Sequence, residues 1–172
     1  AVVRIHLGEQ TYTGVLVEPR GTLLTSAANL KVAPACATVE CSSGRRYTAE
    51  VRGRHLGLDV AVLELTGLDE QTRAALPALP LSGGEALQPG DFVAALGMPL
   101  NASSSEPTRT LGIVSALERL DGPLVQTDAR INAGNAGGPV VALDGRLVGI
   151  VVHADASKPW AQSSGVGFFA PA

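Results

Sequence analysis

The sequence predicts an all-β protein, and three observations favour that fold class. Twenty glycines and eleven prolines in 172 residues supply many turns, which favours short strands over long helices. Hydrophobic residues make up 45% of the chain and aromatic residues only 3%, so we expect an aliphatic core. Short apolar runs recur in both halves of the chain, about six in each. These features predict two antiparallel six-stranded β-barrels, over residues 1–80 and 81–172.

The first half shows the strand pattern in its clearest form. Residues 2–7 alternate apolar and polar side chains, which is typical of a half-buried strand with His6 toward solvent. The Pro and Gly at 18–21 suit a tight turn, and a short helical turn is expected at 25–30. The strands expected in this half are 2–7, 11–18, 22–25, 39–42, 46–53 and 60–65.

Residues 66–90 hold three prolines and no clean hydrophobic period, so we expect the crossing between the barrels there. In the second half, Asp144-Gly145 between two apolar runs indicates a hairpin. The strands expected in this half are 91–97, 108–117, 123–128, 139–143, 146–154 and 165–170.

Composition argues against several classes of partner. A net charge of −3 and a pI near 5.6 give no reason to expect nucleic acid. No apolar run reaches the length of a membrane span. Cys36 and Cys41 could form a local disulfide or be two small buried hydrophobes, and both alternatives stay open. With no histidine nearby, they are a poor zinc signature.

The turn Gly134-Asn135-Ala136-Gly137-Gly138-Pro139 lies between two expected strands of the second half. Glycine tolerates positive φ and close approach, so the N–H groups of such a turn can converge on one point. In acyl-transfer enzymes, a turn of this kind carries the nucleophile and the oxyanion hole, the N–H groups that stabilise the transition-state oxygen. Here the nucleophile's place is taken by a methyl group, which cannot attack a carbonyl carbon.

Five stretches, in this order, closely resemble the trypsin-like serine proteases of the HtrA/DegP family over essentially the whole chain. They are GTLLT at 21–25, DVAVL at 59–63, TLGIVS at 110–115, QTDARIN at 126–132 and GNAGGP at 134–139. The closing GVGFFAP at 165–171 is similar to the family's last strand. The resemblance implies a cleft between the two barrels and an extracytoplasmic location, the periplasm or an equivalent compartment. It leaves the oligomeric state open.

The family's chemistry requires a serine that attacks, a histidine that takes its proton and an aspartate that orients the histidine. By resemblance, Asp59 fills the aspartate position and Ala136 stands at the serine position. The histidine position falls at Ala28 if Gly21 and Thr25 anchor the alignment, and at Asn29 if Asp59 is the anchor.

The resemblance also places the oxyanion hole in the glycine-rich turn. The backbone groups concerned belong to Gly134, Asn135 and Ala136. Ala133 stands where the family usually has proline, which loosens this turn. Because the serine and histidine of the triad are both missing, the chain is expected to be a pseudoprotease that keeps the protease fold without the catalytic side chains.

A site of this kind can still bind, because pairing a peptide with a strand edge needs no catalytic group. We expect the chain to bind a peptide or protein partner, or to act as a scaffold. Arg130 lies near the floor of the family's specificity pocket. By resemblance, the strand edge consists of Val151, Val152, His153 and Ala154.

Two alternatives remain. By resemblance, His55 and His153 lie at the same end of the cleft, where they could bind a transition metal. No other cofactor is expected. The chain could also be an active HtrA-type serine endopeptidase that carries an active-site knockout.

Overall fold

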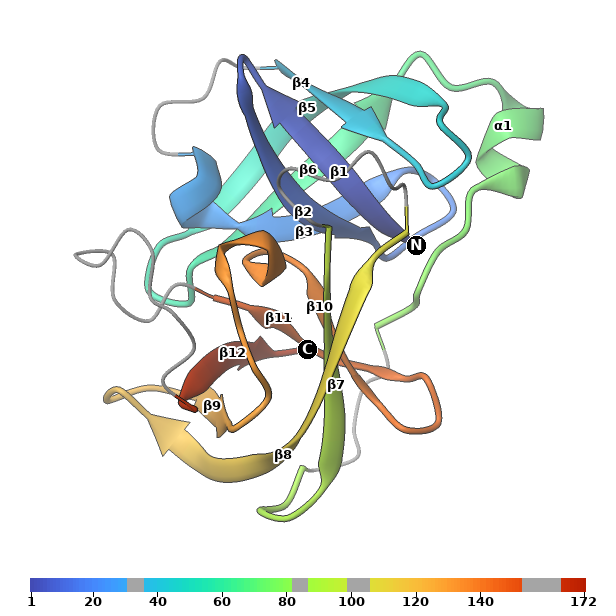
Figure 1. The fold of residues 1–172 in the computed structure, drawn as a ribbon. Coiled ribbons are helices and arrows are strands. Elements are labelled where there is room, and N and C mark those ends of the chain that lie inside the picture. The colour runs from blue at the N-terminus through green and yellow to red at the C-terminus, as the bar shows by residue number, and fades with distance from the viewer. Residues whose placement is uncertain (31–35, 82–86, 99–105, 153–164) are drawn as a thin grey trace.

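The computed structural model describes residues 1–30, 36–81, 87–98, 106–152 and 165–172, and these form two closed antiparallel barrels (Figure 1). This confirms the predicted fold class. The first barrel has the strand order β1-β2-β3-β6-β5-β4. Its strands are β1 (Val2–Leu7), β2 (Gln10–Leu16), β3 (Thr22–Ser26), β4 (Cys36–Glu40), β5 (Arg46–His55) and β6 (Val60–Thr66).

The second barrel has the order β10-β11-β12-β9-β8-β7. Its strands are β7 (Phe92–Gly97), β8 (Thr108–Arg119), β9 (Leu124–Thr127), β10 (Pro139–Ala142), β11 (Leu147–Val151) and β12 (Gly167–Pro171). The division expected at residue 80 lies between β6 and β7, and its position at that residue stays a prediction.

Alternation of inward and outward side chains builds each barrel interior. In β6, Ala61, Leu63 and Leu65 are buried while the residues between them are half-buried, as the period of two requires. The first interior is aliphatic, as the composition predicts. The second is built around Phe169, whose side chain is fully buried among valines and alanines.

A third apolar cluster joins the barrels. Val15 and Val17 from the first barrel are buried against Leu147 and Ile150 from β11. The connecting segment reinforces this seam, because the N–H of Leu79 donates to the carbonyl of Leu16 at 2.8 Å. The two barrels therefore form one packed unit.

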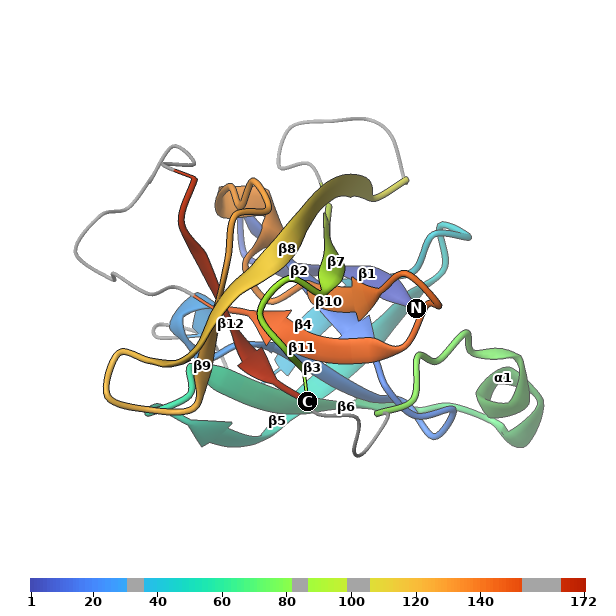
Figure 2. The ribbon, with the colours of Figure 1, turned by 90° about the horizontal axis from the view of Figure 1, so that it is seen from below.

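The crossing between the barrels contains a helix that the sequence analysis did not anticipate. Helix α1 (Glu70–Ala75) begins after Asp69, whose Oδ1 accepts a hydrogen bond from the N–H of Thr72 at 2.7 Å. None of its residues is buried, so it leaves no hydrophobic period in the sequence. Seen from below, α1 lies at the periphery of the molecule (Figure 2).

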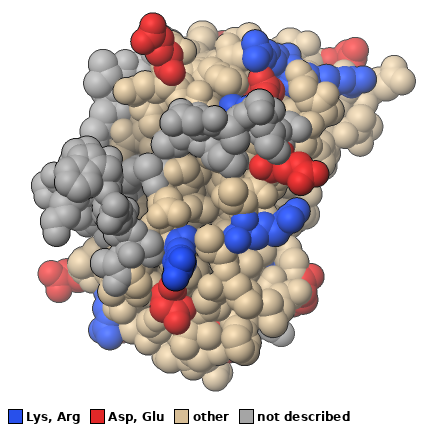
Figure 3. Space-filling model, viewed as in Figure 1, with Lys and Arg blue, Asp and Glu red and all other residues tan. Residues whose placement is uncertain are grey.

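The surface mixes charges of both signs. On the face shown in Figure 3, the basic side chains are scattered among acidic ones and separated by uncharged residues. Within the described ranges, no helix is long and apolar enough to cross a membrane.

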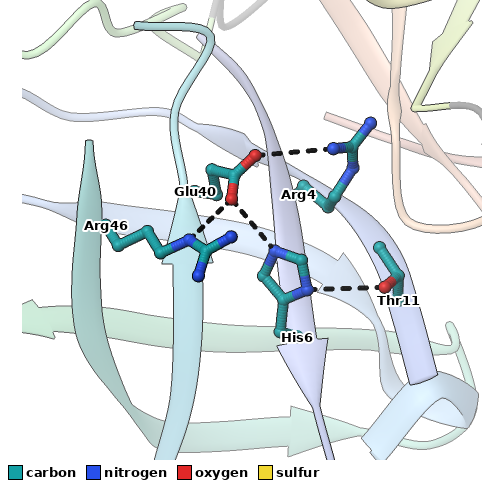
Figure 4. A network of polar contacts seen from close by, with 5 residues as sticks. All are labelled: Arg4, His6, Thr11, Glu40 and Arg46. Carbon is teal, nitrogen blue, oxygen red and sulfur yellow. Dashed lines mark hydrogen bonds and ion pairs between the residues drawn. The ribbon is translucent and has the colours of Figure 1, made fainter. Parts of the chain in front are cut away.

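Glu40 lies at the centre of a charged group on the outside of the first barrel, which we call the outer network: Arg4, His6, Thr11, Glu40 and Arg46 (Figure 4). Pairing of β1, β4 and β5 places Arg4, Glu40 and Arg46 side by side across three strands. Arg46 Nε donates to Glu40 Oε2 at 2.7 Å, and Arg4 Nη1 lies 3.4 Å from Oε1. His6 lies 3.5 Å from the same carboxylate, half-buried at the surface.

Candidate functional site

Asp59 lies directly before β6 in the left-handed region, with φ of +52°. Its Oδ2 accepts a hydrogen bond from the Ser26 hydroxyl at 2.7 Å, and its Oδ1 accepts one from the N–H of Ala28, also at 2.7 Å. Its own carbonyl accepts from the N–H of Ala27 at 3.0 Å. Asp59 therefore fixes the 3₁₀ helix η1 (Ala27–Leu30) against β6.

The glycine-rich turn begins with the short 3₁₀ helix η2 (Ala133–Asn135). The N–H of Asn135 donates to the carbonyl of Asn132 at 2.9 Å, and the Asn135 side chain accepts from the N–H of Asn132 at 3.0 Å. Asn135 thus uses its N–H and its side-chain oxygen to close the turn. The Ala136 methyl is buried, with 3% of the residue exposed.

Gly137 requires glycine for two reasons. Its φ of +84° lies in the left-handed region, and a Cβ there would lie 2.2 Å from Thr25 Oγ1 and 2.4 Å from the Thr13 carbonyl. Both contacts belong to the first barrel. The turn that carries Ala136 is therefore pressed directly against β2 and β3.

Three buried side chains of the first barrel, Thr13, Thr25 and Asn29, hold this turn; we call them the junction network. Thr13 Oγ1 donates to the Gly134 carbonyl at 2.7 Å and accepts from the N–H of Met98 at 2.8 Å. Thr25 Oγ1 donates to the Thr13 carbonyl at 2.7 Å.

Asn29 completes the junction network and reaches the residue at the centre of the turn. Its Nδ2 lies 3.2 Å from the Ala136 carbonyl and 3.4 Å from Thr25 Oγ1. The two candidates for the histidine position thus occupy different surroundings. Ala28 lies against the Asp59 carboxylate through its N–H, whereas the Asn29 side chain is buried against Ala136.

The hydroxyl groups near Ala136 already donate their protons. Ser26 donates to Asp59, Thr13 to the Gly134 carbonyl and Thr25 to the Thr13 carbonyl. A hydroxyl becomes a nucleophile when a general base takes its proton, and of these three only Ser26 donates to a group of that kind, the Asp59 carboxylate. The bond from Thr13 crosses between the two barrels and helps to hold them together.

Comparison with known proteins shows which family this two-barrel fold resembles. Residues 12–150 match the trypsin-like peptidase domain. The chain is 33% identical over 162 residues to the putative protease Do-like 14 of Arabidopsis thaliana, covering 85% of this chain and 36% of that protein. It is 36% identical over 143 residues to a probable periplasmic serine endoprotease DegP-like of Halomonas elongata, covering 80% and 28%.

Solved structures agree with these relatives. The structure of the HtrA-type protease AlgW with tripeptide superposes with a TM-score of 0.82 and 30% identity, over 99% of this chain and 56% of that one. The chain belongs to the trypsin-like peptidases of the HtrA/DegP family. It spans about a third of the length of the curated relatives described above.

The peptide-binding edge expected for an HtrA domain lies only partly within the described residues. Both main-chain groups of Val151 are used internally, by the carbonyl of Gly138 at 2.9 Å and the N–H of Gly137 at 2.8 Å. The N–H of Val152 donates to the Phe168 carbonyl at 3.2 Å, and within the described ranges nothing donates to the Val152 carbonyl. His153 and Ala154 lie outside the described residues.

Arg130, expected near the specificity pocket, is exposed, and its carbonyl accepts from Thr110 Oγ1 at 2.8 Å. The next residue, Ile131, packs against β12. A Cβ on Gly167 would lie 2.4 Å from Ile131 Cδ1, so glycine at that position makes room for the isoleucine.

His55, at the end of β5, is exposed, and its Nδ1 accepts a hydrogen bond from the N–H of Leu58 at 3.1 Å. Its proposed partner in a metal site, His153, lies outside the described residues. Among the residues that the structure describes, no group of three or more potential metal ligands comes together. Metal binding therefore stays a prediction.

Cys36 and Cys41 are both free thiols. Cys36 is exposed at the start of β4, and Cys41 is buried just after that strand. Burial raises the pKa of the Cys41 thiol, which disfavours the reactive thiolate.

No sequence motif predicted the junction network. Thr13 is the residue that could have been noticed, because it is the one polar side chain in the otherwise apolar, buried end of β2.

Proposed function

We propose that this chain is a catalytically inactive HtrA-type domain that binds an extended peptide in its inter-barrel cleft. The observation that carries the proposal is the Ala136 methyl, buried where the family places its serine. Loss of the serine or the histidine alone lowers kcat of a serine protease by roughly 10⁶-fold. We assign the histidine position to Ala28, because its N–H binds the carboxylate of Asp59.

Peptide binding would use main-chain pairing with the strand edge that follows β11. At Val152, which is 4% exposed, nothing within the described ranges donates to the carbonyl, so a peptide that pairs there would supply the donor N–H. The related protease AlgW has been solved with a tripeptide. Because Val151 is fully paired within the chain, the pairing edge would begin at Val152.

The turn at Gly134–Pro139 supports binding more than catalysis. Its conformation depends on internal bonds and on the junction network, and all of these persist with alanine at position 136. The backbone at Gly134 and Ala136 remains our assignment for an oxyanion site, whereas the N–H of Asn135 is already bonded to Asn132. We also propose an extracytoplasmic location, because the DegP-like relative is described as periplasmic.

The test compares hydrolysis and binding in the same preparation. Fluorescent casein is incubated with the chain and with an Ala28→His, Ala136→Ser double variant. We expect no time-dependent hydrolysis by the chain itself, and such hydrolysis surviving removal of contaminating proteases would overturn the proposal. Activity in the double variant would indicate that the site lacks only the histidine and serine side chains for catalysis, as in a knockout of an active enzyme.

Binding is measured by fluorescence anisotropy with a labelled, extended apolar peptide. The matched control is the same peptide with alternate backbone nitrogens methylated, which keeps its side chains and removes its donors. Saturable binding that methylation abolishes supports main-chain pairing. Absence of binding would contradict the peptide-binding role and favour a scaffold.

A further inference from the structure

A pocket of about 310 Å³ opens on the first barrel, away from the glycine-rich turn. One wall is the turn between β4 and β5, with Cys41 and Arg45, followed by Tyr47 on β5. The other wall is the end of α1 with Leu76 just after it; Figure 1 shows α1 beside this turn. Its volume lies at the lower end of the roughly 300–1,000 Å³ typical of ligand sites, which suits a small molecule.

The base of the pocket is apolar because it is continuous with the barrel core. Cys41 and Leu76, 6% and 7% exposed, both belong to the core cluster of the first barrel, and Tyr47 packs against that cluster. The serine hydroxyls at 42 and 43 lie at the rim. A ligand with an apolar body could therefore be covered on one side and solvated on the other.

Arg45 supplies a positive charge at the rim. Within the described ranges it has no carboxylate within 4.0 Å, whereas its neighbour Arg46 is bonded to Glu40 on the barrel surface. Asp69, the cap of α1, accepts hydrogen bonds from Thr72 that lower its pKa, and the charge of Arg45 lowers it further. Because the Arg45 guanidinium forms no ion pair within the described ranges, it can bind an anion, and its planar fork matches a carboxylate.

We propose that this pocket binds a small monocarboxylate with a short apolar body, the carboxylate on Arg45 and the apolar body against Cys41, Tyr47 and Leu76. Charge and shape point to the same orientation. The anion stays at the solvated rim, and the hydrocarbon enters the apolar base. The site is separate from the inter-barrel cleft, so its occupancy does not depend on whether the chain binds peptides or cleaves them.

The probe is 4-phenylbutanoate, titrated into the ¹⁵N-labelled chain and followed by amide chemical shifts. We expect saturable shifts confined to residues 41–47 and 72–77. The uncharged 4-phenylbutan-1-ol tests the charge, and we expect it to bind about tenfold more weakly. Absence of saturable shifts, shifts elsewhere, or equal binding of acid and alcohol would overturn the proposal.

Two variants test the orientation of the ligand. Arg45→Gln should weaken binding of the acid about tenfold and leave the alcohol unaffected. Arg54→Gln is the matched control, since it removes an exposed arginine near the far end of β5 and should leave the shifts unchanged. Ala75→Phe should fill the pocket and block both probes, with the spectrum itself reporting that the fold persists. An Arg45→Gln variant that binds like the unmodified chain would contradict the assignment.

Discussion

The junction network and the outer network are both polar, yet they lie in opposite surroundings. Thr13, Thr25 and Asn29 are neutral and buried; Thr13 and Asn29 bond to main-chain groups of the second barrel, and Thr25 bonds to the Thr13 carbonyl. Glu40 and its partners are charged and lie on the outside of one barrel, where Arg4, His6 and Arg46 each contact the Glu40 carboxylate with side-chain exposures from 12% to 66%. Buried hydrogen bonds are costly to break because the partner left behind has no water, whereas surface ion pairs contribute little. The region that resembles an active site is therefore expected to be the stronger structural element.

The largest effect should come from Gly137→Ala, because the new methyl would collide with Thr25 and Thr13 as well as strain a positive φ. We expect a loss of at least about 3 kcal/mol in the free energy of unfolding. Gly145→Ala separates the two causes, since its φ is +88° and a Cβ there would contact nothing within 4 Å. It should cost about 1 kcal/mol. Urea denaturation measures both, and equal losses would show that close approach does not matter.

Thr13→Val should have the next largest effect. It keeps the shape of the side chain but removes the hydroxyl that bonds both Gly134 and Met98. Two main-chain groups, one buried and one partly buried, lose their partner, for a cost of about 2–4 kcal/mol. Thr22→Val is the control, because the Thr22 hydroxyl bonds an exposed glutamate, Glu18. If both variants unfold at the same urea concentration, the junction network does not stabilise the fold.

Asn29→Leu should have a smaller effect, because it leaves mainly the Ala136 carbonyl without its donor. We expect a loss of about 1–2 kcal/mol by the same urea measurement. Hydrogen exchange at the amides of the glycine-rich turn gives a second measure. Unchanged stability together with unchanged exchange would show that Asn29 does not help to hold the glycine-rich turn.

Glu40→Gln should have the smallest effect, at most about 1 kcal/mol at neutral pH and low salt. The hydrogen bond from Arg46, with the nearby charges of Arg46, His6 and Arg4, lowers the pKa of Glu40 below 4.5. A lowered folded-state pKa stabilises the fold above pH 4.5, and this contribution is lost as pH falls through the folded-state value.

The pH dependence provides the check on Glu40. The stability difference between the chain and Glu40→Gln should be present at pH 7 and disappear well below pH 4.5. Glu9→Gln, at an exposed turn, should show no such difference. A difference that persists at low pH would mean that the charge of Glu40 is not its cause.

Periodicity predicted the barrels because each strand presents one face to an aliphatic interior, as β6 illustrates. It could not predict α1, which buries no side chain and so has no apolar period. The Asp69 cap was the one local signal for that helix.

The site could be predicted only as far as local motifs extend. The glycine-rich turn and Asp59 are recognisable within a few residues. The bond between Thr13 and Gly134 joins positions 121 residues apart, and no local pattern encodes it. The pocket beside α1 was missed for the same reason, since its two walls are distant in sequence and one of them is the unanticipated helix.

The seam of Val15 and Val17 against Leu147 and Ile150 bears on how the chain folds. Each barrel closes its own sheet, yet each barrel alone would expose its apolar seam residues to water. The two barrels should therefore melt in one cooperative transition, and fragments severed in the connecting segment should reassociate into the native pair.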